Sequence, residues 1–227
     1  MKIDRTLFWF KDGEIEFLDL NERFFSLGTL LNRLLNEKYD GKKIEFINID
    51  FSSEKTYKLY PKLPKSDAYY YGGHLRYYGT FDFDEFSRLS DEEQNKFIWE
   101  KACDYLSSSA KSIKNKKLLE ACDYACKKGL ELELNADYRM VEKDVVLFNQ
   151  PLKASVWVNF KKDGMHSKFT LEKDNTIIFE KEIDKTKNGV EFFLEMYKDI
   201  DLKGNDIIIK GRKDVEYLPL KIPIRKE

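Results

Sequence analysis

Residues 6–20 of this chain of 227 residues read TLFWFKDGEIEFLDL, and they decide how the fold begins. Two runs rich in apolar residues, 6–10 and 15–20, flank the dipeptide Asp12-Gly13. An Asp-Gly pair between such runs favours a tight type I′ turn, whose central residues need a positive φ. The stretch therefore predicts a β-hairpin at the start of the chain.

A helical pattern follows this hairpin. Its apolar residues recur every three or four positions, and they are Phe24, Leu27, Leu30, Leu31, Leu34 and Leu35. We expect Asn21 to cap the helix and Tyr39-Asp40-Gly41 to end it. Residues 44–51 then favour a third strand. The chain thus opens with a ββαβ-type unit, in which the helix packs on an antiparallel or mixed sheet.

A helical hairpin is predicted next. Ser90 and Glu93 have the S-x-x-E spacing of a capping box, which marks the start of a helix. A second helix follows and stops at Gly129. Residues 130–134 then alternate leucine with glutamate, which favours a half-exposed strand, with a continued helix as the alternative.

The last third of the chain consists of short apolar runs separated by turn signals such as Asp174-Asn175 and Asn188-Gly189. This pattern is typical of an antiparallel all-β arrangement. The sequence therefore predicts an α+β protein, with an α+β domain at 1–149 and a small all-β domain or sheet extension at 150–227. We expect the second part to pack on the first, because no Gly/Ser/Pro-rich linker separates them.

Composition limits the possible partners. The 40 basic and 41 acidic residues leave a formal net charge of −1, so the chain as a whole does not attract nucleic acid or an anionic membrane. An apolar leader and a membrane-length segment are both missing, which predicts a cytoplasmic protein. Three cysteines without C-x-x-C spacing favour reduced thiols in a reducing compartment, with Cys122 and Cys126 as small buried apolar residues.

The strongest functional signal lies in residues 69–79, which read YYYGGHLRYYG. Tyrosine combines a large apolar ring with a polar tip, so this density favours a recognition surface over a core. Acidic residues follow directly and extend the candidate surface. The predicted binding residues are Tyr69, Tyr70, Tyr71, His74, Arg76, Tyr77, Tyr78, Asp82 and Asp84.

Motifs for catalysis, metal or cofactor binding do not occur. His74 and His166 are the only histidines and have no metal-ligand spacing. Gly72-Gly73 lacks the context of a phosphate-binding loop. The carboxylates Asp82 and Asp84 fit helix N-termini, where negative charge complements the helix dipole. We therefore predict no metal, no cofactor and no catalytic residues.

Three classes of function are compatible with these features. The first is a non-enzymatic protein-binding module, for instance an immunity- or inhibitor-type protein that occludes another protein. The second is an enzyme or carbohydrate-binding protein that uses His74, the tyrosines and Asp82 or Asp84 in a cleft. The third is binding of single-stranded nucleic acid through base stacking on tyrosine, which the near-zero net charge disfavours. The sequence favours the first class.

Overall fold

The computed structural model describes residues 2–225 and has the α+β fold that the sequence predicts. Contacts divide the chain into unit 1, Met1–Ala136, and unit 2, Asp137–Glu227. The sequence placed its boundary between residues 149 and 150. The division falls earlier because β6 (Tyr138–Leu147), a strand that the sequence did not predict, pairs with β7 (Gln150–Lys161).

Unit 1 contains a five-stranded mixed sheet with the order β2-β1-β3-β5-β4. β1 (Arg5–Asp12), β3 (Phe46–Ser52) and β5 (His74–Thr80) are parallel. The edge strands β2 (Ile15–Glu16) and β4 (Ala68–Tyr71) are antiparallel to their neighbours. A mixed sheet was one of the two arrangements expected for this part of the chain.

The predicted hairpin is present, but β2 is short. Asp12 pairs with Ile15, so the turn consists of Gly13 and Glu14, and Gly13 has a φ of 64°. α1 (Leu18–Arg23) occupies residues that were expected to continue the strand.

The single helix predicted after the hairpin is divided in two. α1 and α2 (Phe25–Lys38) meet at Phe24. Asn21 is not a cap, because its Oδ1 accepts a hydrogen bond from the backbone N–H of Phe10 at 3.0 Å. Because β2 is short, the backbone N–H of Phe10 in β1 bonds to the side chain of Asn21 and not to a neighbouring strand.

The helical hairpin is confirmed as α5 (Asp91–Ser112) and α6 (Lys116–Glu131). Ser90 and Glu93 form the predicted capping box at the start of α5. The strand predicted at residues 130–134 is wrong, because α6 continues to Glu131 and a turn follows it. In that turn Glu133 and Leu134 have positive φ.

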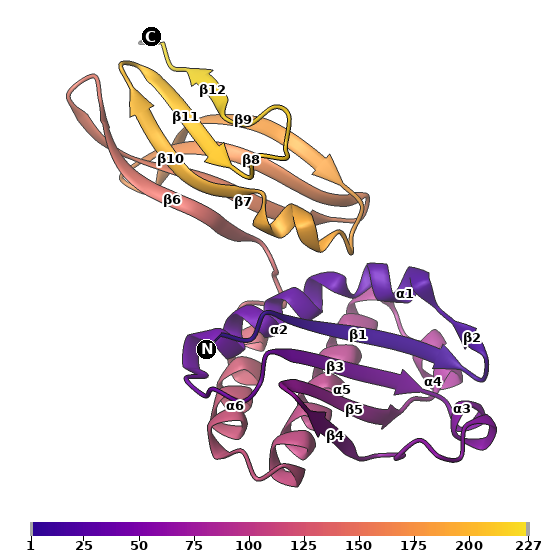
Figure 1. Ribbon diagram of the computed structural model, residues 1–227. Coiled ribbons are helices and arrows are strands. Elements are labelled where there is room, and N and C mark those ends of the chain that lie inside the picture. The colour runs from indigo at the N-terminus through magenta and orange to yellow at the C-terminus, as the bar shows by residue number, and fades with distance from the viewer. Residues whose placement is uncertain (1, 226–227) are drawn as a thin grey trace. The chain divides into compact units, whose positions relative to one another are not determined.

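Helices cover one face of the sheet. α2 contacts β1 and α6, whereas α5 contacts β5 and α6 (Figure 1). Aromatic rings fill the space between the layers: Phe10 stacks on Phe51 at 4.8 Å, and Tyr77 stacks on Tyr105 at 4.9 Å. The described residues include no helix that is long and apolar enough to span a membrane.

A disulfide between Cys103 and Cys126 joins α5 to α6, which corrects the expectation of reduced cysteines. Antiparallel packing of the two helices brings these residues together, and no local spacing in the sequence reveals that. Cys122 is a free thiol 3.6 Å from the sulfur of Cys126, and burial raises its pKa to about 11. Because two of the three cysteines form a disulfide, the cysteines do not favour a reducing compartment.

Unit 2 consists of two antiparallel sheets, as the β-rich pattern predicts. β6, β7, β8 (Gly164–Lys173) and β9 (Thr176–Thr186) form the first sheet. A 3₁₀ turn, η1 (Glu191–Glu195), precedes the second sheet. That sheet consists of β10 (Tyr197–Lys203), β11 (Asp206–Gly211) and β12 (Leu220–Pro223).

A chain of hydrogen bonds links the two sheets of unit 2. The hydroxyl of Tyr197 in β10 lies 2.8 Å from that of Ser167 in β8. Tyr217 lies 2.9 Å from Tyr197 and donates to the carboxylate of Asp184 at 2.8 Å. Burial raises the pKa of Tyr197, so the hydroxyl of Tyr197 keeps its proton at neutral pH and can donate a hydrogen bond.

Reduction of the disulfide should destabilise the protein. Cys103 and Cys126 are 23 residues apart in the sequence, and a loop of this length corresponds to about 3 kcal/mol of unfolding free energy in the chain-entropy model. We expect a reductant to lower the melting temperature of the wild type and to leave that of a Cys126→Ser variant unchanged. Equal melting temperatures of the wild type with and without reductant would contradict the bridge.

Gly129→Ala should also destabilise unit 1, although alanine is the better helix former by about 1 kcal/mol. A Cβ at this position would lie 2.1 Å from Cζ2 of Trp99, which is fully buried. Overpacking of this kind costs about 1–3 kcal/mol, so the net change is a loss. Denaturant titration measures it, with Lys127→Ala on the exposed side of α6 as the neutral control. A stabilised Gly129→Ala variant would contradict this packing.

Candidate functional site

Strand register places side chains in rows across the face of the sheet opposite α2, α5 and α6. One row runs Trp9, Asp50, Tyr78. A second joins Asn48 to Arg76 and Tyr69, and a third joins Phe46 to His74 and Tyr71. We call this surface the open face. Its members are Arg5, Leu7, Trp9, Lys11, Phe46, Asn48, Asp50, Ser52, Tyr69, Tyr71, His74, Arg76, Tyr78 and Thr80.

The tyrosine-rich segment contributes to both sides of the sheet. Tyr69, Tyr71, His74, Arg76 and Tyr78 lie on the open face, where Tyr69 is 54% and Tyr71 is 74% exposed. The predicted binding residues Tyr70 and Tyr77 lie on the helix-covered side. Tyr77 is a core residue, because it is 7% exposed and stacks on Tyr105.

The structure does not bring His74 together with the predicted carboxylates. His74 begins β5 and Asp82 follows its end, so the two are about 25 Å apart at roughly 3.3 Å per residue. Asp82 caps α4 (Phe83–Ser87) by accepting hydrogen bonds from Asp84 and Glu85 at 2.9 and 3.0 Å. The combination of histidine and carboxylates that an enzyme cleft would need is therefore not formed.

Asp82 and Asp84 instead line a cavity of about 440 Å³ with Asp12, Ser53 and Lys55. This cavity lies where β1, β3 and β5 end, the usual place for ligands in parallel sheets. The Ser53 hydroxyl and the Lys55 ammonium, 3.0 Å away, lower the pKa of Asp12. In the described part of the chain, no group of three His, Cys, Asp or Glu side chains is arranged to hold a metal ion. Asp12 is therefore a paired carboxylate, with no proton to donate at neutral pH.

An ion pair between the buried Asp50 and the half-exposed Arg76 lies in the middle of the open face. Arg76 donates two hydrogen bonds to Asp50, from Nε at 2.8 Å and from Nη2 at 3.0 Å. The Asp50 side chain is 7% exposed, and burial raises its pKa in spite of the bonds from Arg76. Asp50 was not among the predicted residues, although a lone carboxylate within a buried strand is a detectable signal.

A pocket of about 280 Å³ lies over this ion pair, and we call it the sheet pocket. Trp9 and Tyr78 from the sheet and Tyr60 and Leu63 from the loop after α3 (Glu54–Leu59) line it. Cations cover two of its rings, since Arg76 lies 5.3 Å from the ring centre of Tyr78 and Lys11 lies 4.8 Å from that of Tyr60. Trp9, Lys11 and Tyr60 were not among the predicted residues, because strand pairing brings Trp9 and Lys11 to this segment and the loop after α3 brings Tyr60.

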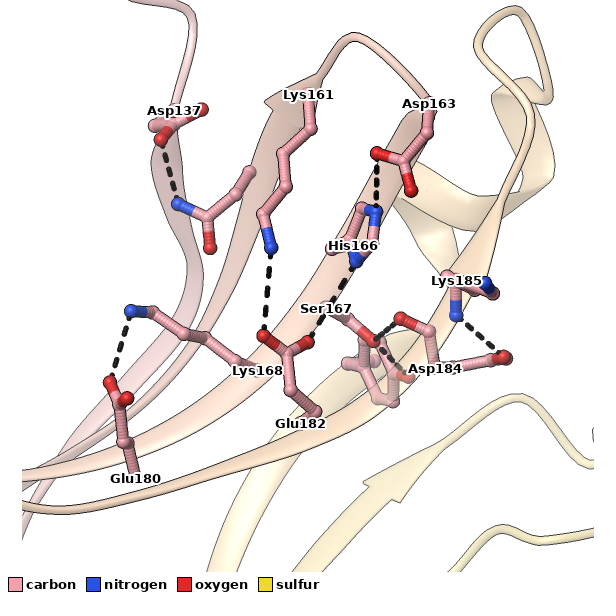
Figure 2. A network of polar contacts seen from close by, with 12 residues as sticks. Asp137, Lys161, Asp163, His166, Ser167, Lys168, Glu180, Glu182, Asp184 and Lys185 are labelled. Atoms are coloured by element: carbon pink, nitrogen blue, oxygen red, sulfur yellow. Dashed lines mark hydrogen bonds and ion pairs between the residues drawn. The ribbon is translucent and has the colours of Figure 1, made fainter.

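The first sheet of unit 2 carries charges that pair with one another (Figure 2). His166 lies 3.0 Å from Asp163 and 4.0 Å from Glu182. Lys168 contacts Glu180 at 3.2 Å, and Lys161 contacts Glu182 at 3.7 Å. These contacts balance the charge locally and are typical of a solvated sheet face. The open face of unit 1 is the stronger candidate.

Comparisons with protein families, with curated proteins and with solved structures found no match for this chain. Its function has to be inferred from its own residues.

Loss of Arg76 should destabilise unit 1 more than neutralisation of Asp50. Arg76→Ala leaves a buried carboxylate unpaired, which costs roughly 3 kcal/mol, whereas Asp50→Asn removes the buried charge and costs about 1 kcal/mol. The control Lys96→Ala removes the cation of an exposed ion pair, with Glu100 at 3.9 Å, and should cost less than about 1 kcal/mol. Denaturant titration compares the three variants.

The pH dependence of Arg76→Ala tests the same pair. Without Arg76 the pKa of Asp50 in the folded state rises further above its unfolded value. The folded variant then binds a proton more tightly than the unfolded chain, so its stability rises as pH falls and is lost as pH rises through that pKa. Arg76→Ala measured in the Asp50→Asn background should lack this dependence. A wild-type-like pH profile of Arg76→Ala would contradict the burial of the charge.

Proposed function

We propose that unit 1 is a non-enzymatic protein-binding module and that the open face contacts the partner. One observation carries this proposal: three parallel strands, which in most proteins are covered on both faces, have helices of unit 1 on only one face. The other face exposes aromatic and cationic side chains. An immunity- or inhibitor-type protein, which occludes its target, needs such a surface and no catalytic group.

The composition of the open face supports a protein partner. Trp9 on β1 is 39% exposed and shares this face with Arg76 on β5 and with Tyr69 and Tyr71 on β4, with β3 lying between β1 and β5. Tryptophan, tyrosine and arginine are the residues most enriched in the hot spots of protein interfaces. Sheet strands hold them rigidly, which reduces the entropy lost on binding.

The same geometry disfavours single-stranded nucleic acid. Base stacking needs a free ring face, but Arg5 lies 5.2 Å from the ring centre of Phe46, and His74 lies 4.6 Å from the same ring. The Tyr78 ring is covered by Arg76, whose charge is already balanced by Asp50.

Truncation of exposed rings on the open face should weaken partner binding and preserve the fold. We expect Trp9→Ala and Tyr71→Ala each to weaken binding by about 2 kcal/mol, or roughly thirtyfold. Affinity capture from the native cell, followed by titration of the captured protein, measures this loss. Tyr124→Ala is the matched control, because this tyrosine lies on α6 in the helix layer.

Thermal melting of every variant separates binding from folding. Tyr77→Ala should unfold unit 1 and is therefore unsuitable as a binding test. Unchanged capture by folded Trp9→Ala and Tyr71→Ala variants would refute the proposal. Capture of a nucleic acid that depends on Tyr71 would replace it with the stacking function.

A further inference from the structure

We infer that the sheet pocket holds an acidic side chain of the partner, flanked there by an apolar residue, and that Arg76 and Lys11 bind its carboxylate. This inference rests on the proposed function of the open face. It names the chemistry of the partner segment that enters the pocket.

The two cations of the pocket can donate further hydrogen bonds. A guanidinium has five N–H groups, and Arg76 uses Nε and Nη2 for its bonds to Asp50, which leaves the Nη1 donors for a ligand. Both carboxylate oxygens of Asp50 are engaged and buried. A ligand that accepts hydrogen bonds therefore fits the pocket better than one that donates them.

Lys11 is the second cation of the pocket, and it is weakly held. Its ammonium lies 3.7 Å from Glu16, whose side chain is 63% exposed and can turn into solvent. A partner carboxylate that displaces Glu16 would gain the ammonium and the Arg76 donors together. Charge-assisted hydrogen bonds of this kind are about twice as strong as neutral ones.

The walls of the pocket suit the apolar part of a side chain. Trp9, Tyr60, Leu63 and Tyr78 surround a volume of about 280 Å³, which is slightly below the range of about 300–1,000 Å³ that small-molecule sites occupy. A single anchor residue of a protein fits this size. Aromatic walls add dispersion contacts to the stem of a glutamate or to a neighbouring aliphatic residue.

Charge around the pocket complements an acidic partner. Lys11 and Arg76 are the cations that line the pocket, and its carboxylates are the exposed Glu16 and the buried Asp50. The neighbouring segment 54–65 contributes Thr56, Tyr60 and Leu63 to the lining and contains four lysines and one glutamate, although Lys55 and Lys65 pair with Asp12 and Glu54. This excess is local, because the whole chain has a formal net charge of −1. Such a patch speeds the docking of an acidic surface.

Selection from a random peptide display library on the immobilised full chain tests the inference. We expect enriched peptides that contain Asp or Glu next to an aromatic or aliphatic residue. Replacement of that acid by its amide should weaken binding about tenfold. Lys11→Met keeps the apolar stem and Arg76→Lys keeps a cation beside Asp50, and each should weaken the peptides about tenfold. Lys127→Met on α6 is the matched control and should bind like the wild type.

Each other outcome overturns the inference. A neutral or basic consensus, no enriched peptide, or a consensus that binds Lys11→Met and Arg76→Lys normally would exclude the acidic anchor. Displacement of the peptides by oligothymidylate would assign the pocket to nucleic acid. A wrong prediction about the acidic anchor can be told apart from a wrong proposed function. The proposed function is tested separately, by binding of the captured partner to the Trp9→Ala and Tyr71→Ala variants.

Discussion

The sheet of unit 1 is covered by helices on one face only, and this constraint organises the rest of the unit. Side chains alternate between the two faces of a strand, so each central strand has to supply a core and a surface at once. In β5, Leu75 and Tyr77 point into the aromatic core, whereas Arg76 and Tyr78 form the surface. The buried Asp50 joins the two roles, because it holds Arg76 on the surface from within the sheet.

Local signals predicted much of the fold. The Asp-Gly hairpin, the Ser90 capping box and the helical pair were all readable, since each depends on residues close in the sequence. β6 was missed because its charged residues obscure the apolar alternation. The disulfide between Cys103 and Cys126 was missed because it depends on helix packing.

The candidate site was only half predictable for the same reason. The segment with Tyr69 and Arg76 stood out by composition. Trp9 and Asp50, which lie on the same face, are 41 residues apart in the sequence. Only the parallel pairing of β1 with β3 brings them side by side. Alternation along β5 would have separated Tyr77 from Tyr78, but the sequence does not reveal which face the helices cover.

The alternation of surface and core side chains along β5 determines which substitutions this strand tolerates. Substitutions at 74 and 78 alter the surface, whereas substitutions at 75, 77 and 79 alter the core, and Arg76 affects both because it pairs with the buried Asp50. Gly79 is fixed most strictly, because a Cβ there would lie 2.3 Å from the ring of Tyr105. The chemistry of the open face can therefore change at positions 74 and 78 while the residues of the same strand that pack in the core stay unchanged.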